Sequence, residues 1–422
     1  MPDTFLYPPD GKPNTQLKLA KIIPFKAVRP TRDKVSLVTS RSYDEYTPAE
    51  LASQLDYNPF SFLHILNPAY VNLQKISATT RFRAVQHKYQ EFKDEGIFKK
   101  ELSPVFYLYE IQGKDGSFTG IIAGTSIEDY KNNIIKKHED TLAYRVEYFK
   151  DYLHQTGFNT EPVLITYPEN TELQEWINTT KHKRPLYVFT SLNREKHTLW
   201  RIKEKREIEW LQEQFEKIGS VYIADGHHRS ASAELLYEED KASGNENLNY
   251  FMSFLICETN LKIYEYNRII QDLNGLSKEQ FLKALSKDFI VKSKAQELWK
   301  PQSKFQYGMY LDGNFYSMEL KETNFGSVLE TLDAQILYER VLHPLLGIGD
   351  LRNDERIDYI PGNKPITAIK EIVDGGDYKV GFMLYPASIN EIKHLADNNL
   401  IMPPKSTYIV PKFRSGLVVY EI

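Results

Sequence analysis

Cysteine is nearly absent from this chain, which has one, Cys257, among 422 residues. A single cysteine excludes an intramolecular disulfide and any metal site built from several thiolates. Its neighbours, FMSFLIC, form an apolar run typical of a buried strand, so we expect a packed thiol and not a nucleophile. With 41% hydrophobic residues, the chain can bury a substantial core without disulfides.

Long apolar runs are also missing. No run reaches membrane-spanning length, and the N-terminus has no basic segment followed by an apolar one, so we expect a soluble, cytoplasmic protein without membrane contact. The formal net charge of -4 provides no general surface for a polyanion, and no nucleic-acid partner is expected. The expected partner is a small-molecule substrate, and the sequence leaves the oligomeric state open.

Several well-known catalytic signatures do not occur. The chain has no Walker-type phosphate loop, no dinucleotide-binding G-x-G-x-x-G, no HExxH and no G-x-S-x-G. Zinc is not expected, because adjacent histidines point in different directions and cannot both serve one metal in the usual way. The metal, if there is one, is unknown at this point.

Aromatic residues are abundant, with 28 Tyr and 22 Phe, and they favour sheets. Helical and strand-like segments interleave throughout, so the fold class is predicted as α/β to α+β, with mixed sheets and interleaved helices. A weak change of pattern near residue 275 predicts two units. Residues 1–274 would form an N-terminal and central α/β unit, and residues 275–422 a C-terminal α+β unit.

Local signals predict individual elements. In TPAELASQL, Thr47 is a helix cap, Pro48 occupies the first helical position and Glu50 completes a capping box. Residues 103–125 read as a hairpin around the turn KDG. Residues 126–157 are rich in charged residues and predict a helix that ends at a glycine.

The stretch VYIADGHHRSASAELL has several charged and polar residues at the point where a predicted strand is followed by a predicted helix. Asp225 can cap that helix, and the glycine after it permits close approach of a ligand. The first-turn amides carry partial positive charge, and two histidines and an arginine share the turn. We therefore expect a phosphate or carboxylate site. Its candidate residues are Gly226, His227, His228, Arg229 and Ser230. The alternative is an ordinary cap with exposed histidines.

The stretch IIKKHEDTLAYRVE supplies cations, a titratable group and a carboxylate within four residues. On a helix, His138 and Thr141 would share a face, and Lys137 would lie one turn from Thr141. This set suits phosphoryl transfer, in which cations neutralise oxygens and a carboxylate accepts a proton or holds a metal. The catalytic candidates are Glu139, His138 and Asp225, with Lys137 as a phosphate ligand. The alternative is a solvated helix face.

The stretch LHPLLGIGDLRNDERIDYIPG alternates acidic and basic residues between apolar segments. Arg352 and Arg356 could clamp an anion, and Asp350, Asp354 and Asp358 could hold a divalent cation. A surface loop laced with ion pairs is the alternative. A phosphate site still needs a general base and a metal carboxylate, so we expect KKHE and RNDERIDY to converge on the ADGHHR turn.

The last polar stretch, IMPPKSTYIVPKFRSG, follows two prolines, which make a rigid approach to a turn. Lys405, Ser406 and Thr407 are its candidate substrate-binding residues. The alternative is a strand edge with ordinary turn residues.

Together these motifs resemble a widespread prokaryotic family known as domain of unknown function 1015. ADGHHR, KKHEDT, the RIDYIPG segment and MPPKSTY–PK–SGLV carry the resemblance, which runs from PFKAVRP to SGLV. The chain departs from the family at TSRSYDEYT, where an APPYDVI-like segment is common, and at Asn267, where a histidine often precedes the arginine. The family implies no well-defined activity.

The DGHHR turn, over residues 219–237, also resembles the phosphate-binding signature of the ParB and sulfiredoxin-like fold. That resemblance implies a ParB/sulfiredoxin-like core around this strand, turn and helix. Enzymes of the fold that carry the motif include nucleotide-dependent kinases of free serine. It therefore implies a nucleotide, ADP or ATP, with Mg²⁺, whose phosphate lies on the amides of residues 226–229.

The expected function is phosphoryl transfer to or from a small hydroxyl metabolite. The best candidate is free L-serine or O-phosphoserine, with the protein acting as a nucleotide-dependent serine kinase or as a phosphoserine phosphatase. One alternative is a ParB-like nucleotide-binding regulatory module without catalysis. The acidic net charge and the absence of a helix-turn-helix pattern argue against DNA binding by such a module. A hydrolase of another phosphorylated metabolite is a further alternative.

Overall fold

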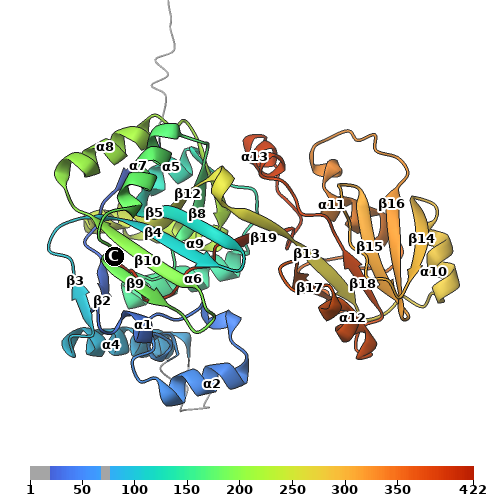
Figure 1. Cartoon of the computed structure of the whole chain (residues 1–422), viewed down its shortest axis with the longest axis horizontal. Coiled ribbons are helices and arrows are strands. Elements are labelled where there is room, and N and C mark those ends of the chain that lie inside the picture. Colours follow the sequence, from blue (N-terminus) through green and yellow to red (C-terminus); the bar gives the residue numbers. More distant parts are fainter. Residues whose placement is uncertain (1–19, 68–76) are drawn as a thin grey trace, which may run out of the picture.

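The computed structural model describes residues 20–67 and 77–422, which form two lobes, the first built on a mixed sheet and the second on an antiparallel sheet (Figure 1). The first lobe holds a nine-stranded sheet. In spatial order its strands are β6 (Ile135–Lys136), β11 (Val221–Asp225), β8 (Val163–Tyr167), β12 (Tyr250–Cys257), β5 (Gly116–Ser126), β4 (Phe106–Gly113), β10 (Lys196–Ile202) and β9 (Tyr187–Thr190), with β1 (Ile22–Ile23) beside β5.

The second lobe holds a seven-stranded sheet. Its strands are β14 (Phe289–Ala295), β16 (Asn314–Leu320), β15 (Gln306–Leu311), β18 (Val380–Met383), β13 (Lys262–Ile270) and β17 (Ile357–Pro361), with β19 (Thr407–Val410) paired to β13. Two small ribbons join β2 (Val28–Pro30) to β3 (Phe98–Lys100) and β20 (Tyr420–Glu421) to β7 (Phe158–Asn159).

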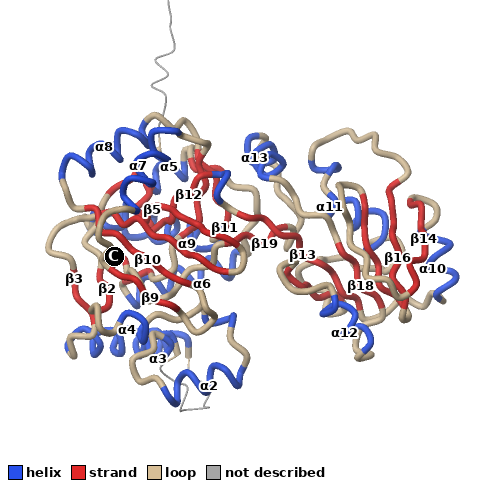
Figure 2. The backbone as a smooth tube through the Cα atoms, in the orientation of Figure 1, coloured by secondary structure: helices blue, strands red, loops and turns tan. Residues whose placement is uncertain are grey.

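Helices are interleaved with these strands, as Figure 2 shows. In the first lobe they are α1 (Val35–Val38), α2 (Pro48–Tyr57), α3 (Leu63–Leu66), α4 (Ala78–Asp94), α5 (Ile127–Lys131), α6 (Ala143–Thr156), α7 (Thr171–Lys181), α8 (Lys205–Glu216) and α9 (His227–Asp240). The remaining helices are α10 (Lys278–Leu285), α11 (Asp333–Leu337), α12 (Thr367–Asp374) and α13 (Ile389–Asp397). The predicted mixed α/β class is confirmed.

The first sheet is buried on both faces, because alternate side chains of a strand point to opposite sides. In β8, Val163 and Ile165 belong to a core cluster that also contains apolar side chains of α5 to α9. Leu164 points to the other face and packs in a cluster that includes Leu395 of α13 and Leu417 near the chain end. Helices α5 to α9 thus cover one face, and α13 with the last residues covers the other.

The chain crosses between the lobes twice. The first half of β13 pairs with β19, and its second half pairs with β17 and β18 in the second sheet. After β19 the chain returns to the first lobe, where Ser415 bridges Ser40 and Val419 bridges Val28. By sheet topology, the second lobe begins at β13, before the break expected near residue 275, and the last residues belong to the first lobe.

Most local predictions are confirmed. Thr47 and Glu50 form a capping box at the start of α2, β4 and β5 form the expected hairpin, and Cys257 is a buried free thiol. Among residues 20–67 and 77–422, no helix is long and apolar enough to cross a bilayer.

The prediction of continuous helix over residues 126–157 is wrong. The segment forms α5, then β6, a loop over residues 137–142, and α6. Asn133 adopts a positive φ of 57° after α5, which ends the helical path. Ile134 and Ile135 are then buried in the sheet core, where Ile135 pairs with Val221. Buried Ile135 and its neighbour Lys136 therefore form an edge strand here.

Candidate functional site

Strand pairing brings the two best motifs together. Strands β6 and β11 run parallel, with Ile135 opposite Val221 and Lys136 opposite Tyr222. Both strands therefore end at the same edge of the sheet, and the KKHED loop after β6 lies beside the DGHHR turn after β11. His227 Nδ1 lies 3.4 Å from Glu139 Oε2 across this junction.

The turn itself requires glycine. Gly226 precedes α9 with φ 101° and ψ 27°, a conformation that side chains rarely adopt. A Cβ at this position would lie 2.8 Å from both Nε and Nη2 of Arg229, because the guanidinium folds back over the turn. Backbone conformation and close packing therefore specify glycine independently of each other.

Asp225 does not cap α9, contrary to the expectation, since the helix start has no side-chain cap. The residue ends β11, and its Oδ2 accepts hydrogen bonds from Arg229 Nη2 at 3.3 Å and from Lys412 Nζ at 3.2 Å. Although burial alone would raise the pKa of Asp225, Lys412 and Arg229 lower it to about 2. This carboxylate is permanently ionised and holds two cations at the turn.

Arg229 is fixed on its other side by Glu161, whose Oε2 accepts from Nη1 at 3.0 Å. Glu161 Oε1 accepts in turn from the hydroxyls of Ser42 at 3.0 Å and Ser415 at 2.9 Å. Ser42 belongs to the TSRSYDEYT segment, so the part of the chain that departs from the family pattern positions Arg229. No local sequence signal pointed to Glu161. Lys412 lies in the Pro-Lys pair of the last motif, but no role was predicted for it.

His227 and His138 are buried, which rules out the alternative of an exposed histidine for His227 and that of a solvated face for His138. Their rings meet edge to face with centroids 4.6 Å apart. Burial lowers the pKa of His138 to about 4 and that of His227 well below its ordinary value. Neither ring therefore adds a positive charge to the turn at neutral pH.

His228 and Ser230 are engaged in the local structure. His228 Nε2 accepts a hydrogen bond from the backbone N–H of Leu142 at 3.1 Å, which ties the KKHED loop to α9. Ser230 donates from Oγ to the carbonyl of His227 at 3.0 Å and from its backbone N–H to Gly226 at 3.1 Å. The helix itself leaves no acceptor for the amides that precede Ser230, including those of residues 227–229.

Glu139 differs from Asp225 in its charge environment. Desolvation and the neighbouring Asp225 raise the pKa of Glu139 to about 7, although Lys405, Lys412 and Arg352 act in the opposite direction. Its side chain is 34% exposed, so a ligand can reach the carboxylate. Near neutral pH, Glu139 exchanges a proton while Asp225 stays ionised.

Lys405 is a cation without a carboxylate partner. Within the described part of the chain no ion pair engages its ammonium, which lies 5.2 Å from the ring centre of Tyr266. Its backbone has a positive φ of 54°, and its carbonyl accepts from the buried Arg268 at 3.2 Å. Next to it, Ser406 Oγ donates to the carbonyl of Pro403 at 2.7 Å, and Thr407 begins β19. Of the three candidate residues in this stretch, Lys405 is the one whose charge acts on Glu139.

Arg352 brings the second lobe to the site. Its Nη2 donates to Asp140 at 3.1 Å, so the RNDERIDY loop reaches the KKHED loop as expected. Lys137 lies on the other side of this loop, with its ammonium 4.4 Å from the ring centre of Tyr130. Residues that are more than two hundred positions apart in the chain therefore converge here.

The rest of the RNDERIDY loop is bonded within itself. Arg356 pairs with Asp354 and donates to the carbonyls of residues 346 and 347. Asp350 accepts from the backbone N–H of Arg352, and Asp358 from that of Tyr359. No three His, Cys, Asp or Glu side chains gather as a metal site in residues 20–67 and 77–422. The loop thus follows the ion-pair alternative, and Arg356 braces it instead of facing the turn.

Comparison with known proteins gives one family match. The model of a family described as "Protein of unknown function (DUF1015)" matches residues 22–335. The motifs after residue 335 lie beyond the matched residues. No curated protein matches the chain.

Three solved structures illustrate the similarity in fold. A free serine kinase variant in complex with AMP is 13% identical, with 71% of this chain and 91% of that chain covered and a TM-score of 0.37. SbnI from Staphylococcus aureus, truncated at its C-terminus, is 14% identical, with 70% and 85% covered and a TM-score of 0.37. A conserved hypothetical protein from Pyrococcus furiosus is 14% identical, with 71% and 95% covered and a TM-score of 0.34. The sequence identities and TM-scores are too low to infer an activity from these structures, and the ParB/sulfiredoxin-like core stays a prediction.

Proposed function

The chain belongs to the DUF1015 family, whose description assigns no function, and we propose from its site that it is a nucleotide-dependent phosphoryl-transfer enzyme. The observation that carries the proposal is the meeting of an open helix N-terminus with Glu139. A carboxylate with a pKa of about 7 lies 3.4 Å from the first residue of that helix. An anion cradle and a base matched to neutral pH are the two parts that phosphoryl transfer to a hydroxyl requires.

The proposed roles follow from charge and position. The amides of residues 227–229 and the guanidinium of Arg229 bind the oxygens of the transferring phosphoryl group. Lys405 adds a positive charge that no carboxylate of the described residues neutralises. His227 and His138, being neutral, shape the wall beside Glu139 and add no positive charge to it.

In the kinase direction, the substrate hydroxyl oxygen forms a bond to the terminal phosphorus as the bond from that phosphorus to the nucleotide breaks. The hydroxyl proton passes to Glu139, and the nucleotide leaves with one phosphate fewer. Asp225 is a poor base for this step, because its pKa of about 2 gives it little affinity for a proton. In the phosphatase direction the same groups would serve water and phosphoserine.

Free L-serine and O-phosphoserine are the proposed substrates, and this finer assignment rests on the resemblance of the DGHHR turn to the signature of free-serine kinases. Mg²⁺ is proposed only as the counter-ion of the nucleotide phosphates, since the described residues form no metal cluster of their own. When bound there, it would neutralise phosphate charge.

The test is turnover of serine with ADP or ATP, and of phosphoserine with AMP or with water. We expect one of these pairs to react with the wild type, and Glu139→Gln to abolish turnover while ADP binding is nearly unchanged. Glu216→Gln is the matched control, because Glu216 is exposed at the end of α8 and has no ion pair in the described part.

Each outcome has a distinct meaning. An active Glu139→Gln variant would move the base to another group and refute the role of Glu139. Failure of every serine pair, with ADP still bound, would remove serine as the substrate. Failure to bind any nucleotide would remove the nucleotide-dependent reaction altogether.

A further inference from the structure

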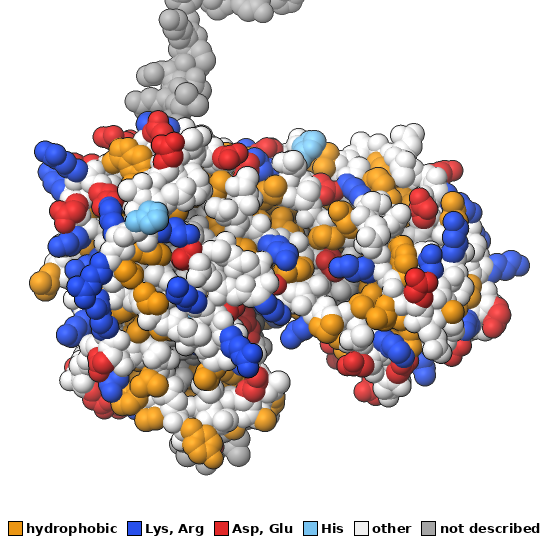
Figure 3. Space-filling model, in the orientation of Figure 1, with side chains coloured by type: hydrophobic (Ala, Val, Ile, Leu, Met, Phe, Trp, Pro, Cys, Tyr) orange, Lys and Arg blue, Asp and Glu red, His pale blue; other side chains and the backbone are white. Residues whose placement is uncertain are grey.

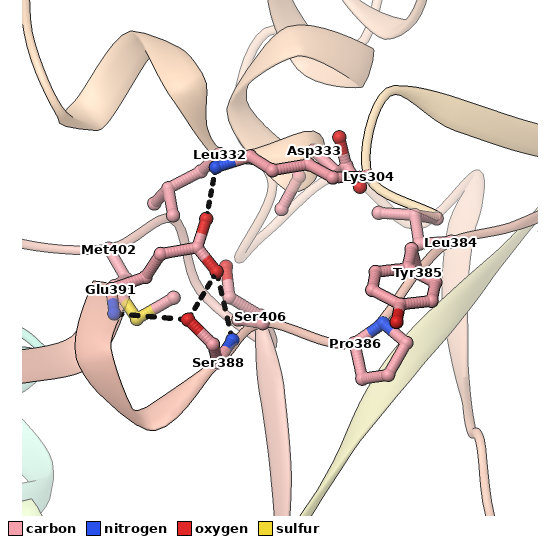
Figure 4. A pocket seen from close by; sticks show the side chains of 12 residues that line it. Lys304, Leu332, Asp333, Leu384, Tyr385, Pro386, Ser388, Glu391, Met402 and Ser406 are labelled. Carbon is pink, nitrogen blue, oxygen red and sulfur yellow. Dashed lines mark hydrogen bonds and ion pairs between the residues drawn. The ribbon is translucent and has the colours of Figure 1, made fainter. Parts of the chain in front are cut away.

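A cavity of about 370 Å³ lies where the two lobes meet, and the proposed reaction does not use it. Its volume is in the range of small-molecule sites. Most of its wall is apolar and includes Leu332, Leu384, Pro386 and Met402 (Figure 4). Leu332 and Met402 belong to the core shared with the first sheet, whereas Leu384 belongs to the core of the second lobe. A ligand in this cavity would contact both lobes.

One buried carboxyl group, Asp333, lines this apolar cavity. Its Oδ1 accepts hydrogen bonds from the backbone N–H of Phe305 at 2.9 Å and from the Tyr307 hydroxyl at 3.2 Å. Within the described residues, no hydrogen bond or ion pair engages its Oδ2. Because Asp333 lines the cavity, this unengaged oxygen leaves a position that a ligand donor can fill.

The serine hydroxyls on the wall present acceptors, whereas the Tyr385 hydroxyl can donate or accept. Ser406 donates its hydroxyl hydrogen to Pro403, and Ser388 donates to Glu391, so each hydroxyl oxygen offers lone pairs instead of a hydrogen. Lys304 is paired with Glu391, and its ammonium also donates to Thr331. With this pair neutralised internally, the lining carries no net positive charge, and ionised Asp333 makes it negative.

An apolar wall, an unengaged carboxylate oxygen and hydroxyls that present lone pairs all favour a ligand with an apolar body and a positively charged hydrogen-bond donor. From this geometry we infer that the cavity binds a small organic ammonium ion through Asp333 Oδ2. An anion would meet Asp333 and Glu391, and a neutral alcohol would lack the charge that makes a hydrogen bond to a buried carboxylate strong.

Binding should depend on pH. Burial raises the pKa of Asp333 to about 7, with Glu391 adding to the shift and Lys304 and the Tyr307 hydroxyl opposing it. An alkylammonium ion stays charged across this range, since amines of this type titrate near about 10.4. Affinity should therefore rise by about tenfold between pH 6 and pH 8, as Asp333 goes from mostly protonated to mostly ionised.

The experiment titrates the full chain with three probes of one shape: isoamylamine, isoamyl alcohol and isocaproate. Calorimetry at pH 8 is expected to detect isoamylamine alone, with weaker binding at pH 6. Asp333→Asn keeps the two hydrogen bonds to Oδ1 and should lose the binding of isoamylamine and its pH dependence. Glu322→Gln, which changes an exposed carboxylate of the second lobe outside the cavity lining, is the control that should still bind.

Equal binding of the alcohol, undiminished binding by Asp333→Asn, or no binding of any probe would overturn the inference. If the Asn variant does not fold, the pH dependence in the wild type decides. Affinity that is unchanged or falls between pH 6 and pH 8 would refute the role of Asp333. The nucleotide assays of the proposed function are unaffected by these outcomes, so the two proposals fail separately.

Discussion

Replacing Gly226 by alanine tests whether the position of the Arg229 guanidinium over the DGHHR turn matters for stability and for ADP binding. The matched control is Gly157→Ala at the end of α6. Both glycines have positive φ, 101° at Gly226 and 74° at Gly157. At Gly157 a Cβ would meet nothing within 4 Å, whereas at Gly226 it would lie 2.8 Å from two nitrogens of Arg229.

The expected magnitudes follow from this difference. A side chain in the left-handed region costs about 1–2 kcal/mol, and this is the whole loss expected for Gly157→Ala. At Gly226 the guanidinium must also leave Glu161 and Asp225, and each partly exposed ion pair contributes about 0.2–1 kcal/mol. Because solvent screens the exposed Asp225, its pair lies at the lower end. We expect Gly226→Ala to destabilise the protein by about 2–3 kcal/mol.

Urea unfolding of both variants measures the stability difference, and calorimetric titration with ADP measures the site. Gly226→Ala should lose at least tenfold in ADP affinity, while Gly157→Ala should bind like the wild type. If both variants lose the same stability and bind ADP equally well, the position of Arg229 over the turn has no energetic importance.

Three more predictions concern the reaction. Arg229→Ala should lower kcat/KM by about 10²–10³, and Arg229→Lys should restore little of it, because a point charge cannot replace a planar fork; steady-state kinetics of the two variants would contradict this if lysine restored the rate. The rate should fall as pH decreases through about 7, where Glu139 becomes protonated. In pH–rate profiles, Lys405→Met should move this acidic limb to higher pH, and Asp225→Asn should move it to lower pH, because the two charges act on Glu139 in opposite directions. Shifts of both variants in the same direction would refute the assignment. EDTA should stop nucleotide turnover without changing the melting temperature of the nucleotide-free protein; a lower melting temperature would reveal a metal site within the fold.

The sequence sufficed wherever the decisive interactions are local. The capping box at Thr47, the KDG hairpin and the strand-turn-helix at Gly226 each depend on residues within a few positions of one another. Their side chains and backbone angles specify the element without help from the rest of the chain. For the same reason, the open amides at the start of α9 could be placed from sequence.

The sequence could not reveal interactions that depend on distant partners. The two-residue strand β6 exists because β11 lies beside it, and without that partner its charged surroundings read as helix. Arg229 is held by Glu161, and Asp225 by Lys412, across separations of 68 and 187 residues. Neither acid–base pair leaves a pattern in its own neighbourhood. Convergence of the motifs could be expected on chemical grounds, but its individual contacts could not.

The choice of base shows most clearly what the three-dimensional arrangement adds. From sequence, Glu139 and Asp225 were equal candidates, since each is a carboxylate within a polar motif. In the structure, Asp225 takes Lys412 and Arg229 as partners, which lower its pKa to about 2. The same Asp225 charge then acts on Glu139 and, with desolvation, raises its pKa to about 7. Two carboxylates whose pKa values are driven apart in this way suit the roles that we propose, in which Asp225 holds cations and Glu139 accepts the proton. These roles depend on Lys412, which belongs to the last residues of the chain. In sequence, these residues follow the strands of the second sheet and return to the first lobe.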